Sequence, residues 1–262
     1  MIDYSLYSKQ MVLPGFGLVQ QQRLLQAKVL VIGAGGLGCP VIQYLSAMGV
    51  GTMGIIDDDI VEKSNLHRQI LFGVNDIGSL KVDVVNKLLN ERNPSLQIHT
   101  YPYRLTNRNA LQMIASYDVV VDATDNFETR YLLNDACVLL DKPFVHAAIF
   151  AHEAQLSVFN YGPINERTTY RDAFPTLPQT GEVPSCADAG VLGVYPGIIG
   201  CMQALEVVKL LSGCGKVLQN KILIYHFLTH QSYTIQLTRN ALIQYPSREQ
   251  LLAADYTVTC AF

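Results

Sequence analysis

Short apolar runs and amphipathic stretches alternate through the first half of the chain. Residues 28–32 and 52–57 are short, rich in β-branched side chains and bounded by glycine, which is typical of buried parallel strands. Between them, residues 38–48 carry apolar side chains at helical spacing, and Gly49 and Gly51 punctuate the return. The pattern predicts a β-α-β unit of about thirty residues.

The same alternation continues to about residue 150. We expect three more strands and three more helices, at residues 97–101, 117–122 and 144–147 and at residues 20–26, 110–114 and 128–139 respectively. Strands that alternate with helices in this order favour crossover connections and a parallel sheet. The fold class predicted is therefore α/β, with a Rossmann-like, doubly wound and mainly parallel sheet.

The pattern changes in the second half of the chain. Three segments there predict strands joined by turns, which favours antiparallel pairing: residues 154–160, 221–225 and 232–237. The loop over 161–184 is rich in proline and glycine, and a connection of that length in a compact domain is usually functional or mobile. A buried helix broken by Pro196 and Gly197 is expected over 191–211, and the tail at 241–262 should be peripheral or a linker.

Composition narrows the class of protein. The chain has 262 residues, of which 49% are hydrophobic and 16% charged, which is enough for a substantial core. The formal net charge of −3 argues against nucleic-acid binding through a large basic surface. Six scattered cysteines form no C-x-x-C pair, and no run suggests a membrane span or a secretory signal. We expect a cytoplasmic protein with no disulfide framework.

A glycine-rich turn follows the first predicted strand. Residues 31–38 contain G-x-G-x-x-G as Gly33, Gly35 and Gly38, with Gly36 inside it, and Asp57 lies about twenty residues further on. Such a turn lets the backbone and the start of a helix approach phosphate, while the acidic residue binds ribose. The turn alone does not separate NAD from ATP, and a purely structural turn is the simpler alternative.

Two cations follow that a dinucleotide enzyme would not require. Arg68, within Ser64-Asn65-Leu66-His67-Arg68-Gln69, can hold two phosphate oxygens at once, and Lys81 follows a Gly-Ser pair at a predicted helix start. Either residue by itself would be interpreted as a solvated surface residue. The order and spacing of the two together indicate a triphosphate-binding site. Beside Asp57, Asp59 is a weaker candidate for a metal or catalytic contact.

A further acidic segment lies at the end of the buried strand predicted at 117–122. Asp125 and Asn126 stand where open α/β sheets bind ligands. Asp125 is a candidate for holding Mg²⁺ with ATP, and its structural alternative is the N-cap of the next helix.

These residues occur in a set that resembles the sulfur-carrier-protein adenylyltransferases of the MoeB, ThiF and HesA type, within the ubiquitin-activating-enzyme superfamily. The resemblance covers about residues 4–240. The matching pieces are Tyr7-Ser8-Lys9-Gln10, Leu13-Pro14-Gly15-Phe16-Gly17, the glycine turn with Cys39-Pro40, Asp57-x-Asp59, Ser64-Asn65-Leu66-x-Arg68-Gln69, Gly78-x-x-Lys81, Asp125-Asn126 with Arg130, and residues 184–193 around Cys186.

The resemblance implies a reaction and a domain plan. Such enzymes bind Mg·ATP and a ubiquitin-like protein ending in Gly-Gly, adenylate its carboxylate and release pyrophosphate for later sulfur transfer in molybdopterin or thiamine biosynthesis. It implies one domain over 1–240, with a helical segment at 1–26, an ATP-binding half at 27–150 and a carrier-binding half at 151–240 that contains the crossover loop.

The resemblance also assigns roles within a homodimer. Arg68 would face the β- and γ-phosphates, Lys81 the α-phosphate, Asp125 the metal, and Lys9 the phosphates of the partner subunit. Cys186 would bond covalently to the carrier. The nucleotide-binding set it implies is Gly33, Gly35, Gly36, Gly38, Asp57, Asp59, Ser64, Asn65, Arg68, Lys81, Asp125 and Asn126.

The chain departs from the family pattern at two places. Lys9 stands where the family has arginine, so the charge is kept but the bidentate fork is lost. The zinc-binding members carry two C-x-x-C pairs, and here Thr169-Tyr170-Arg171-Asp172 replaces the first while the second is missing. Because structural zinc takes four thiolate or imidazole ligands, we expect a zinc-free protein.

Three functions compete at this stage. Adenylation of a sulfur carrier is preferred. The alternatives are a related enzyme that adenylates a peptide or an RNA-linked carboxylate, and a non-catalytic dimeric binding module. A dehydrogenase would explain none of the downstream residues.

Overall fold

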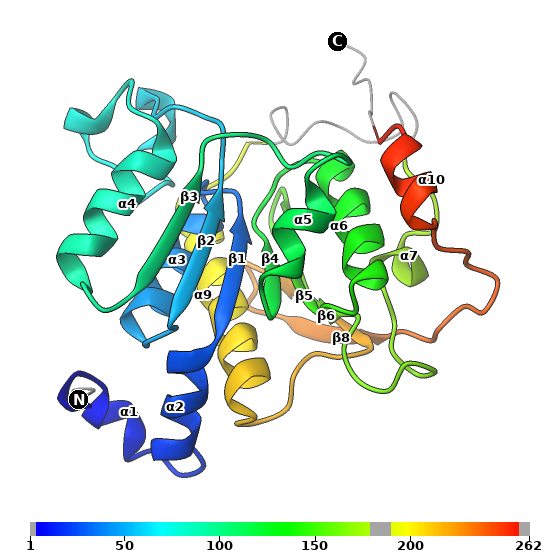
Figure 1. Ribbon diagram of the computed structural model, residues 1–262, viewed down its shortest axis with the longest axis horizontal. Coiled ribbons are helices and arrows are strands. Elements are labelled where there is room, and N and C mark those ends of the chain that lie inside the picture. The colour runs from blue at the N-terminus through cyan, green and yellow to red at the C-terminus, as the bar shows by residue number, and fades with distance from the viewer. Residues whose placement is uncertain (1–3, 179–189, 257–262) are drawn as a thin grey trace.

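The computed structural model describes residues 4–178 and 190–256, and within them a single sheet runs through the molecule (Figure 1). Its strand order is β3-β2-β1-β4-β5-β6-β7-β8. The strands are β1 (Lys28–Ile32), β2 (Thr52–Ile56), β3 (Gln97–Tyr101), β4 (Val119–Asp122), β5 (Phe144–Phe150), β6 (Glu153–Phe159), β7 (Lys221–His226) and β8 (Ser232–Gln236).

The sheet divides into a parallel and an antiparallel half. All pairings among β1 to β5 are parallel, and those from β5 through β6 and β7 to β8 are antiparallel. The parallel strands are joined by helical crossovers, whereas short turns join β5 to β6 and β7 to β8. The prediction of a doubly wound, mainly parallel sheet continued by antiparallel strands is confirmed.

Helices cover both faces of the parallel half (Figure 1). The side chains of β1 alternate, so that Val29 and Val31 enter one core and Leu30 and Ile32 the other. The first face carries α2 (Leu18–Gln26), α3 (Gly38–Ala47), α4 (Lys81–Arg92) and α9 (Val194–Ser212). The second carries α5 (Ala110–Ala115), α6 (Phe127–Leu139), α7 (Tyr170–Ala173) and α10 (Arg248–Ala253).

The helix α9 passes unbroken through Pro196 and Gly197, contrary to expectation. Pro196 lies in the first turn, where a missing backbone N–H removes no helical hydrogen bond. This helix is long and apolar enough to cross a membrane by length and composition, with half of that stretch buried in the protein. Its Ile199, Ala204 and Val207 side chains lie in the core shared with α3 and the sheet, as in the core helix of a globular domain.

The tail lies at the surface of the domain over the residues that the structure describes, mostly exposed but held there by several contacts. The Leu251 side chain on α10 is fully buried against α6. Nearer the sheet, the Tyr245 hydroxyl bonds the Thr169 hydroxyl at 2.7 Å, and the Asn240 backbone N–H donates to Asp172. Residues 240–256 are therefore part of the packed domain, because one buried leucine and several hydrogen bonds hold them.

Candidate active site

A cavity of about 860 Å³ opens at the carboxyl ends of the parallel strands. This size is typical of small-molecule sites, which range over roughly 300–1,000 Å³. Loops that follow β1, β2, β3 and β4 line it, together with the start of α9 and the end of the described tail. The connection after β1 leads to β2 on one side of the sheet, and the connection after β4 leads to β5 on the other side. The cavity therefore lies at the point where the strand order reverses, which is where doubly wound sheets bind their ligands.

The glycine turn forms one wall of this cavity. Gly33 has a φ of +96°, and a Cβ there would lie 2.7 Å from the Ala123 carbonyl oxygen. A Cβ on Gly38 would lie 2.0 Å from the Gly33 carbonyl oxygen. Only glycine fits at these two positions, and the result is that Gly35, Gly36 and the start of α3 face the cavity with their backbone.

Asp57 follows β2 and is held against the turn by backbone donors. Its carboxylate accepts from the Ala34 N–H at 2.7 Å and from the Asp59 N–H at 2.9 Å. Burial raises the pKa of Asp57 above its ordinary value, although the Ala34 N–H and the Lys81 charge act in the opposite direction. A fixed acceptor beside the glycine turn is what binding of ribose hydroxyls requires.

Lys81 begins α4 and points toward the same space. Its side chain is only 4% exposed, and its Nζ lies 2.7 Å from the Asp59 carboxylate, which is 60% exposed. Asp59 thus holds the ammonium in the cavity. Asp58 also lines the cavity and pairs with Arg104 there.

The segment after Asp59 supplies an arginine and an amide. Arg68 lines the cavity, half-buried, with its Nη1 donating to the Ser64 carbonyl at 3.1 Å. Asn65 also lines it, whereas Ser64 is exposed outside the lining and its hydroxyl donates to Glu62. Gln69 was not among the predicted site residues, yet it is buried in the lining and its Oε1 has no hydrogen-bond partner among the described residues.

Asp125 and Asn126 lie across the cavity from these cations, at the β4 to α6 turn, and both are exposed. Asn126 caps α6 by accepting from the Thr129 N–H at 2.9 Å. The N-cap of α6 is therefore Asn126. Asp125 does not have the capping role that was its structural alternative.

A buried polar network lies under that turn. Asp122, at the end of β4, accepts from the His146 Nδ1 at 2.7 Å and from the Thr124 hydroxyl at 2.6 Å, and Arg130 Nε stands 3.7 Å away. Burial alone would raise the pKa of Asp122, but His146, Arg130 and Thr124 hold it below its ordinary value. Arg130 also donates to the Thr124 carbonyl, so the network fixes the backbone that carries Asp125.

Three predicted residues of the described chain are absent from the cavity lining, namely Lys9, Gly38 and Ser64. Lys9 is exposed on α1 (Ser8–Met11), which lies at the opposite end of the molecule (Figure 1). Cys186 falls outside the described residues. Gly190 and Val191, which follow that gap, line the cavity.

The segment that replaces the first cysteine pair is a helical turn. Thr169 and Asp172 cap it reciprocally, and Arg171 forms a two-point ion pair with Asp135 at 2.7 Å. Among the described residues no cluster of three or more histidine, cysteine or acidic side chains could hold a metal ion. Absence of zinc stays a prediction.

Comparison with known proteins decides the family. Residues 7–245 match the ThiF family. The chain belongs to the ThiF family. It is 45% identical over 260 residues to a sulfur carrier protein adenylyltransferase of Thermus thermophilus, covering 97% of this chain and 95% of that protein.

Two further comparisons concern a longer relative and a solved structure of the same fold. The chain is 44% identical to an adenylyltransferase and sulfurtransferase MOCS3 of Xenopus laevis, covering 98% of this chain and 57% of that protein, so it spans little more than half of that relative. A crystal structure of Escherichia coli MccB has the same fold, with a TM-score of 0.80 at 20% identity over 94% of this chain and 75% of that one.

Proposed function

We propose that this ThiF-family chain adenylates the C-terminal carboxylate of a ubiquitin-like sulfur carrier protein, using ATP. One observation carries the proposal. The glycine turn, the Asp57 acceptor and the cations Arg68 and Lys81 all line a single cavity. The glycine turn can bind the phosphates of ATP, and Asp57 can bind its ribose. The two cations beside them can stabilise the charge that develops on a reacting triphosphate. The relative in Thermus thermophilus is named for this activity, and the match covers 95% of its length.

The reaction assigns a task to each group. A carboxylate oxygen of the carrier attacks the α-phosphorus, a new P–O bond forms, and the bridging bond to the β-phosphate breaks to release pyrophosphate. Lys81 neutralises charge that develops on the phosphates, and Arg68 holds their oxygens. Because carboxylate is a weak nucleophile, positioning against the phosphorus provides much of the rate.

The Mg²⁺ that accompanies ATP needs an oxygen ligand in the cavity. Asp57 is engaged by two backbone N–H groups and Asp59 by Lys81. We assign Asp125 to the metal in this proposal, since it is exposed on the cavity wall and the network under it fixes its backbone.

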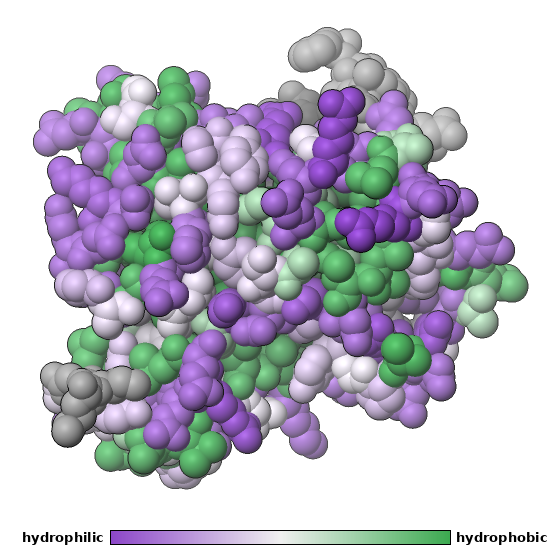
Figure 2. Space-filling model, viewed as in Figure 1, coloured by the Kyte–Doolittle hydropathy of each residue, from purple (hydrophilic) through white to green (hydrophobic). Residues whose placement is uncertain are grey.

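The proposal includes a homodimer in which Lys9 completes the partner's site. Figure 2 shows apolar side chains gathered on the N-terminal helices of a mostly hydrophilic face. Leu6, Val12 and Leu13 flank Lys9 and are 59% to 79% exposed. Such a patch beside a cation supports a protein interface there. Covalent use of Cys186 in sulfur transfer is also part of the proposal.

Exchange of labelled pyrophosphate into ATP tests the proposed function. We expect exchange that depends on a carrier protein ending in Gly-Gly, and the same carrier lacking the final glycine serves as the matched control. Exchange that needs a different carboxylate would indicate a related adenylating enzyme. Absence of exchange with every carrier, in protein that binds ATP, would indicate a binding module.

A further inference from the structure

The cavity extends beyond the region that the glycine turn and the two cations define. Lys81 and Arg68 lie on the side of the sheet covered by α3, α4 and α9. The other part of the lining lies on the side covered by α5, α6 and α10, and consists of the loop after β3, the first turn of α6 and residues 254–256. In the proposed function the triphosphate lies at the cations and the ribose at Asp57, which leaves this second part of the lining for the base.

The C-terminal segment reaches that part of the cavity because three contacts hold it. Leu251 is fully buried against α6. Asn107, in the loop after β3, donates through Nδ2 to the Leu252 carbonyl at 2.9 Å and to the Ala254 carbonyl at 3.0 Å. The Tyr256 hydroxyl donates to the Asp135 carboxylate at 2.8 Å. The wall is thus a fixed element of the domain.

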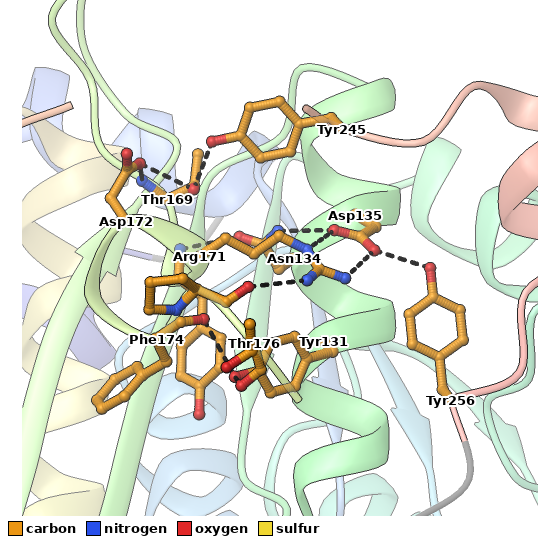
Figure 3. Close-up of polar contacts among 12 residues, drawn as sticks. Tyr131, Asn134, Asp135, Thr169, Arg171, Asp172, Phe174, Thr176, Tyr245 and Tyr256 are labelled. Atoms are coloured by element: carbon orange, nitrogen blue, oxygen red, sulfur yellow. Dashed lines mark hydrogen bonds and ion pairs between the residues drawn. The ribbon is translucent and has the colours of Figure 1, made fainter. Parts of the chain in front are cut away.

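Figure 3 shows that Asp135 serves two segments at once. One carboxylate oxygen accepts from Tyr256, and both accept from Arg171, which also packs over the Tyr131 ring. The Tyr131 hydroxyl in turn donates to the Phe174 carbonyl at 3.1 Å. Asp135 is 1% exposed, so this junction is rigid and places the end of the tail with little freedom.

We propose that residues 254–256, which follow α10, form the base-side wall of the nucleotide cavity and that Asn107 and Tyr256 are the residues that position this wall. The inference rests on the proposed function, since it needs ATP as the ligand. It predicts that the tail contributes to binding of the adenosine part of ATP and contributes nothing to binding of the phosphates. Neither Asn107 nor Tyr256 needs to take part in the chemical step.

Calorimetric titration with Mg·ATP and with Mg·tripolyphosphate separates the two parts of the ligand. For Asn107→Ala, which loses both hydrogen bonds to the tail, we expect the Kd for ATP to rise about tenfold while the Kd for tripolyphosphate is unchanged. Tyr256→Phe loses one hydroxyl and keeps the ring, and about a threefold rise is expected for ATP alone. Asn90→Ala is the matched control, because Asn90 is exposed on α4 and bonds only within its own helix.

The outcomes distinguish the inference from the proposed function. Wild-type protein that does not bind ATP would defeat the proposed function. The inference is overturned if wild-type protein binds ATP and the two variants lose affinity equally for ATP and tripolyphosphate. It is also overturned if they lose affinity for neither ligand. If Asn107→Ala does not fold, Tyr256→Phe decides in the same titrations, because it removes one hydroxyl, keeps the ring and adds no charge.

Discussion

The two ends of the nucleotide cavity are built from different kinds of chain segment. At the phosphate end, the glycine turn, Asp57 and Lys81 come from within about fifty residues of one another, as two consecutive crossovers of one sheet. At the base end, the loop after β3 meets residues nearly 150 positions later, since Asn107 bonds to Ala254. The first end is a property of the β-α-β unit, whereas the second exists only after the whole domain has packed.

Under both ends lies the Asp122 network, and its removal should have the largest effect. In Asp122→Asn the charge of the buried Arg130 side chain is left without its partner, so we expect the free energy of unfolding to fall by about 3–5 kcal/mol. Urea titration measures this. Asp118→Asn, an exposed carboxylate just before β4, is the control, and an equal loss in the two variants would contradict the assigned role.

Removal of a cation should affect only the phosphate end. Lys81→Ala is expected to lower carrier-dependent pyrophosphate exchange by roughly 10²–10³-fold, by analogy with the loss of one preorganised donor to a developing charge. The exposed Lys87 on the same helix gives the matched control Lys87→Ala. If both variants lose the same activity, Lys81 acts through the fold and has no direct part in the reaction.

Asp57 stands between the two ends and should show an intermediate effect. Asp57→Asn loses the charged acceptor for the ribose, so we expect the KM for ATP to rise about tenfold with a smaller change in kcat. Asp58→Asn is the control, because Asp58 pairs with Arg104 at the cavity rim. A rise in KM for both variants would show a general effect of charge near the cavity.

The smallest effect we predict is a pH dependence that originates in His146. Burial lowers the pKa of His146 more than its hydrogen bond to Asp122 raises it. The pKa of His146 is lower in the folded protein than its unfolded value of about 6.5, so the unfolded chain binds the proton more readily. The contribution of His146 to the free energy of unfolding is therefore complete above about pH 6.5 and is lost as the pH falls below it. Unfolding free energies should therefore decline from pH 7 to pH 5. A flat profile in wild-type protein, or the same slope in His146→Asn, would reject this origin.

Local pattern was enough for much of the fold and half of the site. Residues 28–32 coincide with β1, because a β-branched apolar run ended by glycine leaves few other structures open, and residues 97–101 coincide with β3. Asp57 and Lys81 were found because their positions follow from strand ends and a helix start. Gln69 and His146 were missed, since nothing in a single sequence tells which amide or imidazole becomes buried beside a cavity.

The C-terminal tail shows where local pattern fails. Residues 241–262 follow the last predicted strand and have no counterpart strand, so a peripheral position or a linker was the expectation. Leu251 alone supplies the buried contact, and Tyr245, Tyr256 and Asn107 add hydrogen bonds to groups far away in the chain. Contacts between segments so distant in sequence leave no periodicity to read.

The sequence by itself determined the β-α-β unit, the conformation of the glycine turn and the order of the charged groups, because sterics at Gly33 and the alternation of β1 act over a few residues. Only the tertiary structure decided that Lys81 is held by Asp59, that Asp122 and His146 support the Asp125 turn, and that the tail reaches the cavity. Those arrangements depend on burial, which forces each polar group to find a partner wherever packing has placed one.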